Sequence, residues 1–221
     1  MDNFEELRQQ MIDRQLAARG IHDQTVLNAL GTVPREAFIP TDLIEFAYKD
    51  SPLPIEENQT ISQPFIVALM TAALELKSDD RVLEVGTGSG YAAAVLGEIC
   101  ETVYTIERHK ALADTAQIKL KELGYTNVQV KHGDGTLGWV DHAPFDAIIV
   151  AAGGPEAPQA LKEQLAIGGR MVIPVGASLN SQKLVRIRRI NENEYETEDL
   201  GGVRFVPLIG VAGWQEKNNE S

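Results

Sequence analysis

Hydrophobic residues recur along this chain with two different periods, and the change between them divides it. Over residues 4–19 they return every three or four positions, the spacing of one helix face, and Gly20 follows as a stop. A second short helix is predicted from Asp23, a good N-terminal cap, to Gly31. A third is predicted to begin at Pro64, because proline suits the first turn of a helix.

From Arg81 onward, short hydrophobic runs alternate with helical patterns. Strands buried on both faces are predicted over Val82–Val85, Thr102–Ile106, Val128–Val130, Phe145–Ala151 and Arg170–Pro174. Helices are predicted between them, over Gly90–Ile99, His109–Leu123 and Glu156–Leu165. This alternation is typical of right-handed crossover units, and therefore of a mostly parallel sheet with helices on both faces.

The pattern changes again after Gly176, where only strand-like segments remain. Leu184–Ile190 alternates between hydrophobic and polar residues, Asn191–Asn193 reads as a turn, and residues 201–214 are again strand-like. We therefore predict an α/β fold in which a mostly parallel sheet carries antiparallel C-terminal strands and an N-terminal helical cap.

A length of 221 residues fits one domain with a terminal elaboration, since domains average about 150 residues. We expect a single domain over residues 1–221. Its four parts are N-terminal helices with a proline-rich surface segment (1–63), an α/β core (64–176), C-terminal strands (177–214) and a polar tail (215–221).

Charge and cysteine content narrow the classes of partner. With 20 basic and 32 acidic residues the net charge is −12, which disfavours nucleic acid and anionic membranes as partners. The single cysteine, Cys100, cannot form an internal disulfide, and the longest hydrophobic run, Ala147–Ala152, is far shorter than the ~20 residues of a membrane helix. No secretory signal is visible at the start, so a cytoplasmic location is expected. The four histidines show no metal-ligand spacing, and no metal site is expected.

The strongest local signal is a glycine-rich turn that follows the first predicted strand of the core. Its glycines, Gly86, Gly88 and Gly90, let a ligand approach the backbone, and the following helix offers unpaired N–H groups. Glu84 lies inside the hydrophobic strand, where a charge needs a partner. A cationic ligand would supply one, although a salt bridge to Arg or Lys is the structural alternative. The candidate ligand-binding residues of this turn are Glu84, Gly86, Thr87, Gly88, Ser89 and Gly90.

Two further acidic residues follow the next two predicted strands. Glu107 ends the second strand, where a carboxylate is placed to accept hydrogen bonds from ribose hydroxyls. Asp134 and Gly135 follow the third strand, and the Asp134 carboxylate suits the exocyclic amine of a purine. Because the carboxyl ends of parallel strands meet at one edge of a sheet, a nucleoside-bearing cofactor is predicted there.

The turn has the spacing G-x-G-x-G rather than the G-x-G-x-x-G of dinucleotide-binding folds, and no phosphate loop with lysine is present. The ligand that fits these residues has a ribose, an adenine and a cationic amino-acid end, but no phosphates. S-adenosylmethionine matches this description, and NAD is the alternative cofactor. The turn with Glu84 resembles the first motif of the Rossmann-like, S-adenosylmethionine-dependent methyltransferases.

Several longer segments resemble the protein-L-isoaspartate O-methyltransferase family in the expected order over residues 30 to 210. The most family-specific is Gln59-Thr-Ile-Ser-Gln-Pro64. The others are Val33–Phe38, Tyr48–Ile55, Val82–Leu96, His132–Gly135, Pro144–Asp146, Gly168–Gly176 and Phe205–Leu208. Glu56 and Glu57 depart from the family pattern, which is commonly less acidic there.

The resemblance implies an enzyme that transfers methyl from S-adenosylmethionine to the carboxylate of L-isoaspartyl residues in damaged proteins and peptides, releasing S-adenosylhomocysteine and initiating repair. It implies that Ser62, whose hydroxyl family members use near the transferring methyl group, is the catalytic residue. Thr60, Gln63 and Val206 are then expected to bind substrate beside it. Ser62 also lies just before Pro64, at a helix N-terminus that favours an anionic carboxylate.

Two other functions stay open from the sequence. One is an S-adenosylmethionine-dependent methyltransferase acting on another small-molecule or protein carboxylate, or on nucleic acid. The other is a cofactor-binding module without catalysis, against which the intact Ser62, Glu84 and Glu107 argue. We expect a monomer that binds neither nucleic acid nor membrane.

Overall fold

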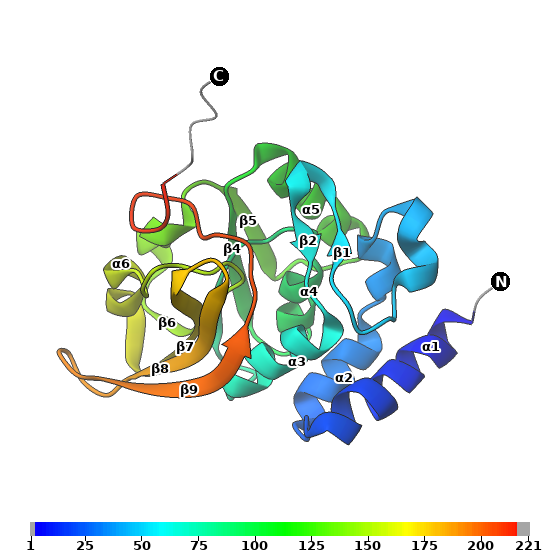
Figure 1. The fold of residues 1–221 in the computed structure, drawn as a ribbon, viewed down its shortest axis with the longest axis horizontal. Coiled ribbons are helices and arrows are strands. Elements are labelled where there is room, and N and C mark those ends of the chain that lie inside the picture. The colour runs from blue at the N-terminus through cyan, green and yellow to red at the C-terminus, as the bar shows by residue number, and fades with distance from the viewer. Residues whose placement is uncertain (1–2, 216–221) are drawn as a thin grey trace.

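The computed structural model describes residues 3–215 and is built around one seven-stranded sheet (Figure 1). The strand order is β5-β4-β3-β6-β7-β8-β9; neighbours from β5 to β7 run parallel, whereas β8 and β9 are antiparallel. The strands are β3 (Arg81–Val85), β4 (Thr102–Glu107), β5 (Val128–His132), β6 (Phe145–Val150), β7 (Leu165–Ser178), β8 (Ser181–Arg189) and β9 (Tyr195–Val203). The predicted fold class is confirmed.

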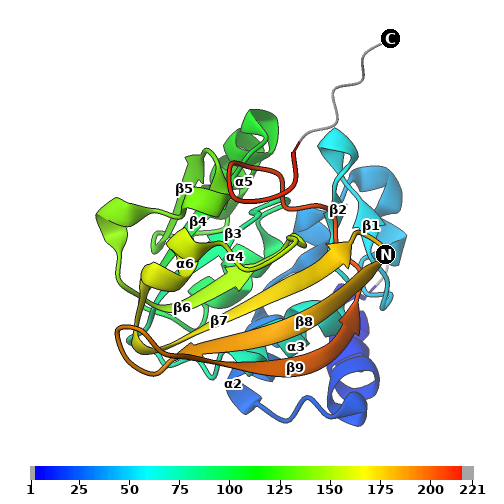
Figure 2. The same cartoon turned by 60° about the vertical axis from the view of Figure 1, so that its left-hand side comes forward.

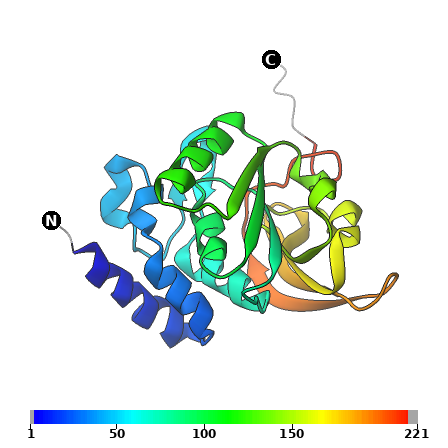
Figure 3. The same ribbon diagram turned by 180° about the vertical axis from the view of Figure 1, so that it is seen from behind.

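Helices cover both faces of this sheet. The helical segments are α1 (Phe4–Gln10), which continues through a π segment (Met11–Leu16) and a 3-10 turn (Ala17–Arg19), then α2 (Gln24–Thr32), α3 (Pro64–Ala73), α4 (Tyr91–Gly97), α5 (Lys110–Glu122) and α6 (Gln159–Glu163). The N-terminal helices pack with α3 and α4 in one hydrophobic core, whereas α6 packs in a second core on the opposite face (Figures 2 and 3). Shorter 3-10 turns lie at Arg35–Phe38, Thr41–Phe46, Glu56–Asn58, Gly135–Leu137 and Val140–His142.

Successive side chains of the central strands pack alternately in these two cores. Val82 of β3 packs in the core of the N-terminal helices, and its neighbours Leu83 and Val85 pack in the other. Glu84 therefore points to the same side of the sheet as Val82, because side chains alternate along a strand. This face of the sheet packs against the N-terminal helices.

The predicted starts of two helices, α2 and α3, are confirmed. Asp23 caps α2, since its carboxylate accepts hydrogen bonds from the backbone N–H groups of Thr25 (2.9 Å) and Val26 (3.2 Å). Pro64 occupies the first turn of α3. Between them, the proline-rich segment forms a small antiparallel pair, β1 (Leu53–Pro54) with β2 (Thr60–Ile61), outside the main sheet.

Several predicted segments differ from the structure. The strand predicted over Arg170–Pro174 is β7, which runs from Leu165 to Ser178. Strand β5 lies at the edge of the sheet, so its side chains are half-buried or exposed and not buried on both faces as predicted. The last strand is Tyr195–Val203, not residues 201–214, because acidic residues of β9 pair with basic ones of β8: Glu198 lies opposite Arg186, and Glu196 opposite Arg188. Charge complementarity across the pair stabilises a strand whose own sequence is polar. The helix predicted over 156–165 is only Gln159–Glu163, since Pro158 precedes it and Leu165 already pairs with β6. Of the predicted polar tail, residues 216–221 lie outside the described residues.

Candidate functional site

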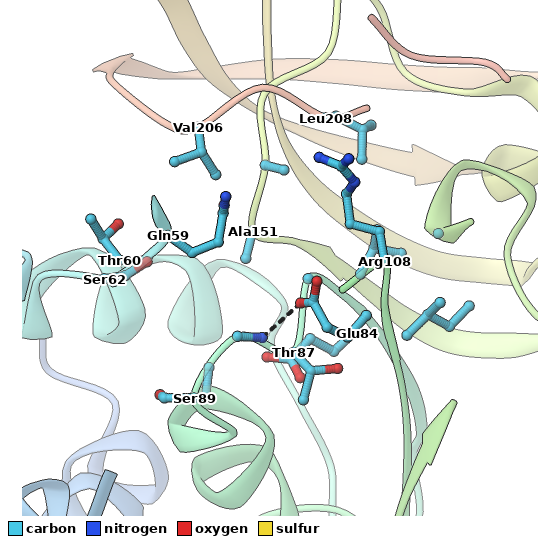
Figure 4. Close-up of a pocket in the computed structure, with 18 of the residues that line it drawn as sticks. Gln59, Thr60, Ser62, Glu84, Thr87, Ser89, Arg108, Ala151, Val206 and Leu208 are labelled. Carbon is cyan, nitrogen blue, oxygen red and sulfur yellow. Dashed lines mark hydrogen bonds between the residues drawn. The ribbon is translucent and has the colours of Figure 1, made fainter. Parts of the chain in front are cut away.

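A cavity opens at the carboxyl edge of the parallel strands, and the glycine-rich turn forms its floor (Figure 4). Gly86, Gly88 and Gly90 all have positive φ, at 96°, 54° and 90°. Side chains other than hydrogen are strained in that region, so glycine is required for the turn to fold back over the strand ends. A Cβ on Gly90 would also press on Ala116 and Leu120 of α5, at 3.4 and 3.5 Å.

The cavity brings together most of the residues predicted from the sequence. The lining includes the predicted residues Thr60, Ser62, Glu84, Gly86, Thr87, Gly88, Ser89, Glu107, Gly135 and Val206. Gln63 lies in an adjoining groove that shares Thr60, Ser62 and Val206 with the cavity. Gly90 and Asp134 are absent from both linings, so their predicted contacts with a cofactor stay predictions.

Glu84 is a buried carboxylate with one oxygen free. Its side chain is 1% exposed, and Oε2 accepts a 2.6 Å hydrogen bond from the Thr105 hydroxyl, which also bonds the Thr87 hydroxyl at 2.6 Å. Oε1 has no hydrogen-bond partner, and no ion pair with Glu84 occurs within residues 3–215. Burial raises the pKa of Glu84 to about 8. The alternative of a salt bridge to Arg or Lys is therefore wrong, and the orphaned oxygen fits a cationic ligand group.

Glu107 ties the end of β4 to the glycine-rich turn. Its Oε2 accepts a 2.9 Å hydrogen bond from the backbone N–H of Gly88, drawn in Figure 4, and Oε1 accepts one from that of His109 at 2.9 Å. Each carboxylate oxygen has a second lone pair, so both can also accept from a diol. The prediction that Glu107 holds the ribose hydroxyls is compatible with this position.

Asp134 accepts hydrogen bonds from its own turn and from the C-terminal loop. One carboxylate oxygen accepts from the backbone N–H and hydroxyl of Thr136, at 2.8 and 2.7 Å, and the other from the backbone N–H of Val211 at 2.8 Å. The hydrogen bonds from Val211 and Thr136 keep the pKa of this carboxyl low despite its partial burial. Its neighbour Gly135 faces the cavity, and a Cβ there would collide with Val85 at 2.4 Å.

Ser62 sits between β2 and α3 with its backbone fixed from outside its own segment. The buried guanidinium of Arg35 donates to the Ser62 carbonyl at 2.8 Å. Helix α3 is capped by Asp50, which accepts from the backbone N–H of Phe65 at 3.1 Å and from the Gln63 amide at 2.7 Å. Within residues 3–215 no hydrogen bond involves the Ser62 hydroxyl, and Ser62 does not cap α3. The hydroxyl is available for a ligand.

Sequence reasoning missed several residues of the cavity. Ala151 and Ala152 follow β6, and Figure 4 places Ala151 between Val206 and the glycine-rich turn. The rule that located Glu107 could have found them, because β6 is also parallel and ends at the same edge. Arg108 and Tyr91 also line the cavity, directly after predicted residues.

No group of three or more His, Cys, Asp or Glu side chains within residues 3–215 could hold a metal ion. Over the same range, no helix is long and apolar enough to cross a bilayer. Cys100 is buried, and burial raises its pKa to about 12, so it is an inert core thiol.

Three features define the class of protein as a Rossmann-like, S-adenosylmethionine-dependent methyltransferase. They are the mostly parallel sheet, the glycine-rich turn after β3 and the carboxylate of Glu107 at the end of β4. The chain superposes with a TM-score of 0.85 on a solved structure named protein-L-isoaspartate O-methyltransferase, at 29% identity over 93% of this chain and 67% of that one. A protein from Plasmodium falciparum, described as a putative protein-L-isoaspartate O-methyltransferase in complex with S-adenosyl-L-homocysteine, gives 0.79 at 28% identity, covering 95% and 99% of the two chains.

The family follows from the sequence comparisons. The model of the protein-L-isoaspartate(D-aspartate) O-methyltransferase family matches residues 6–213. Protein-L-isoaspartate O-methyltransferase 2 of Pelobacter propionicus is 59% identical, covering 96% of this chain and 94% of that protein. A protein-L-isoaspartate O-methyltransferase of Rhodopseudomonas palustris is 58% identical, covering 93% and 94%. The chain belongs to the protein-L-isoaspartate O-methyltransferase family.

Proposed function

We propose that this chain transfers the methyl group of S-adenosylmethionine to the carboxylate of L-isoaspartyl residues in damaged proteins and peptides, and so initiates their repair. The observation that carries the proposal is the cavity in which the Ser62 segment meets the glycine-rich turn. Membership of the family and relatives at 51–59% identity that bear the name of this activity support it.

The residues of the cavity fit S-adenosylmethionine. The unpartnered Oε1 of Glu84 suits its ammonium group, the Glu107 carboxylate suits the ribose hydroxyls, and the glycines admit the ligand close to the backbone. When bound, this cosubstrate supplies an electrophilic methyl group on a sulfonium cation. The remaining demands fall on residues of the chain.

The transfer needs little acid–base help from the protein. A free carboxyl has a pKa of about 4, so the isoaspartyl carboxylate is already ionised and nucleophilic at neutral pH. Its oxygen forms the bond to the methyl carbon while the carbon–sulfur bond breaks and its electron pair stays on sulfur. The chain must orient the carboxylate and exclude water. A neutral hydroxyl such as that of Ser62 orients an anion without the tight ion pair that would weaken it as a nucleophile.

The methyl ester makes the carboxyl carbon a better target for the backbone nitrogen that follows. Attack by that nitrogen expels methanol and closes a succinimide, whose hydrolysis partly restores normal aspartate. Thr60, Gln63 and Val206 are proposed to contact the peptide, since all three line the groove beside Ser62.

We extend the proposal to location and assembly: a cytoplasmic monomer that acts on protein and not on nucleic acid or membrane. The net charge of −12 supports the choice of partner, and a fold whose one cysteine is buried and unpaired suits a reducing compartment. Light scattering tests the monomer.

The direct test of the function compares two peptides that differ only at one residue, L-isoaspartyl in one and normal aspartyl in the other. Methyl transfer from labelled S-adenosylmethionine should occur to the isoaspartyl peptide and be near background for its twin. Equal labelling of both peptides would favour a general carboxyl methyltransferase, and labelling of neither would overturn the proposal.

A further inference from the structure

One buried cation joins the two halves of the site. Arg35, in the 3-10 turn Arg35–Phe38, is 0% exposed. Its Nε donates to the carbonyl of Ala47 at 2.8 Å, and its Nη2 donates to the carbonyl of Ser62 at 2.8 Å. Its guanidinium also lies 4.7 Å from the ring centroid of Tyr91. Burying a guanidinium is costly unless such partners compensate for lost water.

Two of these partners, Ser62 and Tyr91, belong to different segments that line the cavity. Ser62 carries the hydroxyl proposed to meet the substrate, whereas Tyr91 is the first residue of α4, directly after the glycine-rich turn. Both line the cavity, and Arg35 itself does not. One planar guanidinium group therefore connects the segment of Ser62 to the start of α4.

A second buried arginine, Arg170, makes its hydrogen bonds far from the cavity and so serves for comparison with Arg35. Arg170, 7% exposed, donates to the carbonyls of Leu74, Glu75 and Asp146 and pairs with Asp80 at 2.8 Å. Those partners lie at the amino ends of the parallel strands, away from the cavity. Arg35 leaves its Nη1 without a partner within residues 3–215, so it satisfies fewer of its donors.

We propose that Arg35 is a positioning residue for methyl transfer: by contacting both the Ser62 carbonyl and the Tyr91 ring, it fixes where the Ser62 hydroxyl lies relative to the glycine-rich turn. The inference rests on the proposed function. A carbonyl held by a hydrogen bond fixes the backbone of its residue, which leaves the hydroxyl only its side-chain rotation. Misplacement of a reacting group by about 1 Å can cost about a hundredfold in rate.

Two variants of Arg35 test this role. Arg35→Met keeps an unbranched side chain but removes both hydrogen bonds and the charge, and in the folded protein it should lower kcat about tenfold to a hundredfold. Affinity for S-adenosylhomocysteine should stay within about threefold, since Arg35 does not line the cavity. Arg35→Lys retains a cation and one carbonyl contact and should recover part of kcat. Arg170→Met is the matched control: it should destabilise the protein yet leave kcat within about twofold wherever urea unfolding shows it is folded.

A double-mutant cycle with Ser62→Ala decides the mechanism. If Arg35 acts through Ser62, the double variant should be no slower than the slower single variant, whereas losses from Arg170→Met and Ser62→Ala should multiply. Should Arg35→Met fail to fold, Arg35→Lys carries the cycle. Multiplying losses at Arg35, or a loss of activity that tracks only the unfolded fraction, would overturn the inference. Absence of methylation by the unaltered protein would instead overturn the proposed function.

Discussion

Asp50 caps helix α3 from fifteen residues upstream: its Oδ1 accepts a 3.1 Å hydrogen bond from the backbone N–H of Phe65. The same carboxylate accepts from the Gln63 amide and pairs with Arg19, whose guanidinium lies 3.6 Å from the ring centroid of Phe65. Side chains of the N-terminal region, Asp50 and Arg19, thus hold the segment around Ser62. Because Asp50 caps α3, the Ser62 hydroxyl is not needed for that role.

Loss of this cap should affect both stability and catalysis. Asp50→Ala should lower the free energy of unfolding by about 1 kcal/mol, the usual cost of a lost cap, and also lower kcat because Ser62 precedes the frayed turn. Asp23→Ala removes the cap of α2, whose carboxylate bonds Thr25 and Val26, and serves as the control. Urea unfolding should give similar losses for both variants, and steady-state methylation a lower kcat for Asp50→Ala alone. A similar kcat in both variants would refute the link between cap and Ser62.

The raised pKa of Glu84 predicts that affinity for S-adenosylhomocysteine depends on pH. Burial raises its pKa to about 8, so at pH 6 the ligand-free protein holds Glu84 protonated, while a bound ammonium group favours the ionised form. Cofactor binding should therefore release a proton, and affinity for S-adenosylhomocysteine should rise toward pH 8, by at most about tenfold per pH unit. Calorimetry in buffers of different ionisation enthalpy measures both. Glu84→Gln should bind more weakly at pH 8 and lose the pH dependence; an unchanged slope would exclude Glu84.

The same carboxyl should reduce stability of the ligand-free protein at neutral pH. The pKa of Glu84 is about 8 in the folded protein and about 4.5 in the unfolded chain. The stability that comes from its neutral form is therefore fully present below about pH 4.5 and is lost as the pH rises from about 4.5 through about 8. Glu84→Gln cannot ionise, so this part of the pH dependence should disappear. Chemical denaturation of both proteins at pH 5 and pH 8 measures the difference.

Glu107→Ala should weaken S-adenosylhomocysteine binding by about 1.5–3 kcal/mol, the range for hydrogen bonds to a charged group. The variant also frees the backbone N–H groups of Gly88 and His109, so Glu107→Gln, which can still accept hydrogen bonds, should lose less. Calorimetry that finds full affinity in folded Glu107→Ala would remove Glu107 from the cofactor site.

The choice between cofactors is testable without turnover. S-adenosylhomocysteine should raise the melting temperature in line with ln(1 + [L]/Kd), while NAD at the same concentration should have no effect. The G-x-G-x-G turn and its neighbouring carboxylates are the basis of this expectation. Stabilisation by NAD alone would contradict it.

Much of the site was predictable because it follows local rules. The glycine-rich turn, Glu84 and Glu107 all sit at or near the ends of strands whose hydrophobic pattern is visible in the sequence, and parallel strands bring such ends together. Pro64 likewise marks the start of α3, which places Ser62 just outside a helix.

The remainder depends on contacts between residues far apart in the chain. The backbone N–H of Val211 donates to the Asp134 carboxylate from 77 residues later in the chain. Strand β9 is polar in sequence and becomes a strand through charge pairing with β8. Arg35 and Asp50 reach Ser62 and Phe65 across 27 and 15 residues. Periodicity and local motifs carry no information on such partners.

The central claim is that Ser62 orients a substrate carboxylate that is already nucleophilic, and steady-state methylation of one L-isoaspartyl peptide by the unaltered protein and Ser62→Ala tests it most directly. A hydrogen bond to a charged group is worth about 1.5–3 kcal/mol, so kcat should fall by about one to two orders of magnitude, with S-adenosylhomocysteine affinity nearly intact. Under saturating cosubstrate, kcat should stay flat from about pH 6 upward, since no further proton must be lost. A variant as fast as the unaltered protein, or a methyl group trapped on Ser62, would contradict the account.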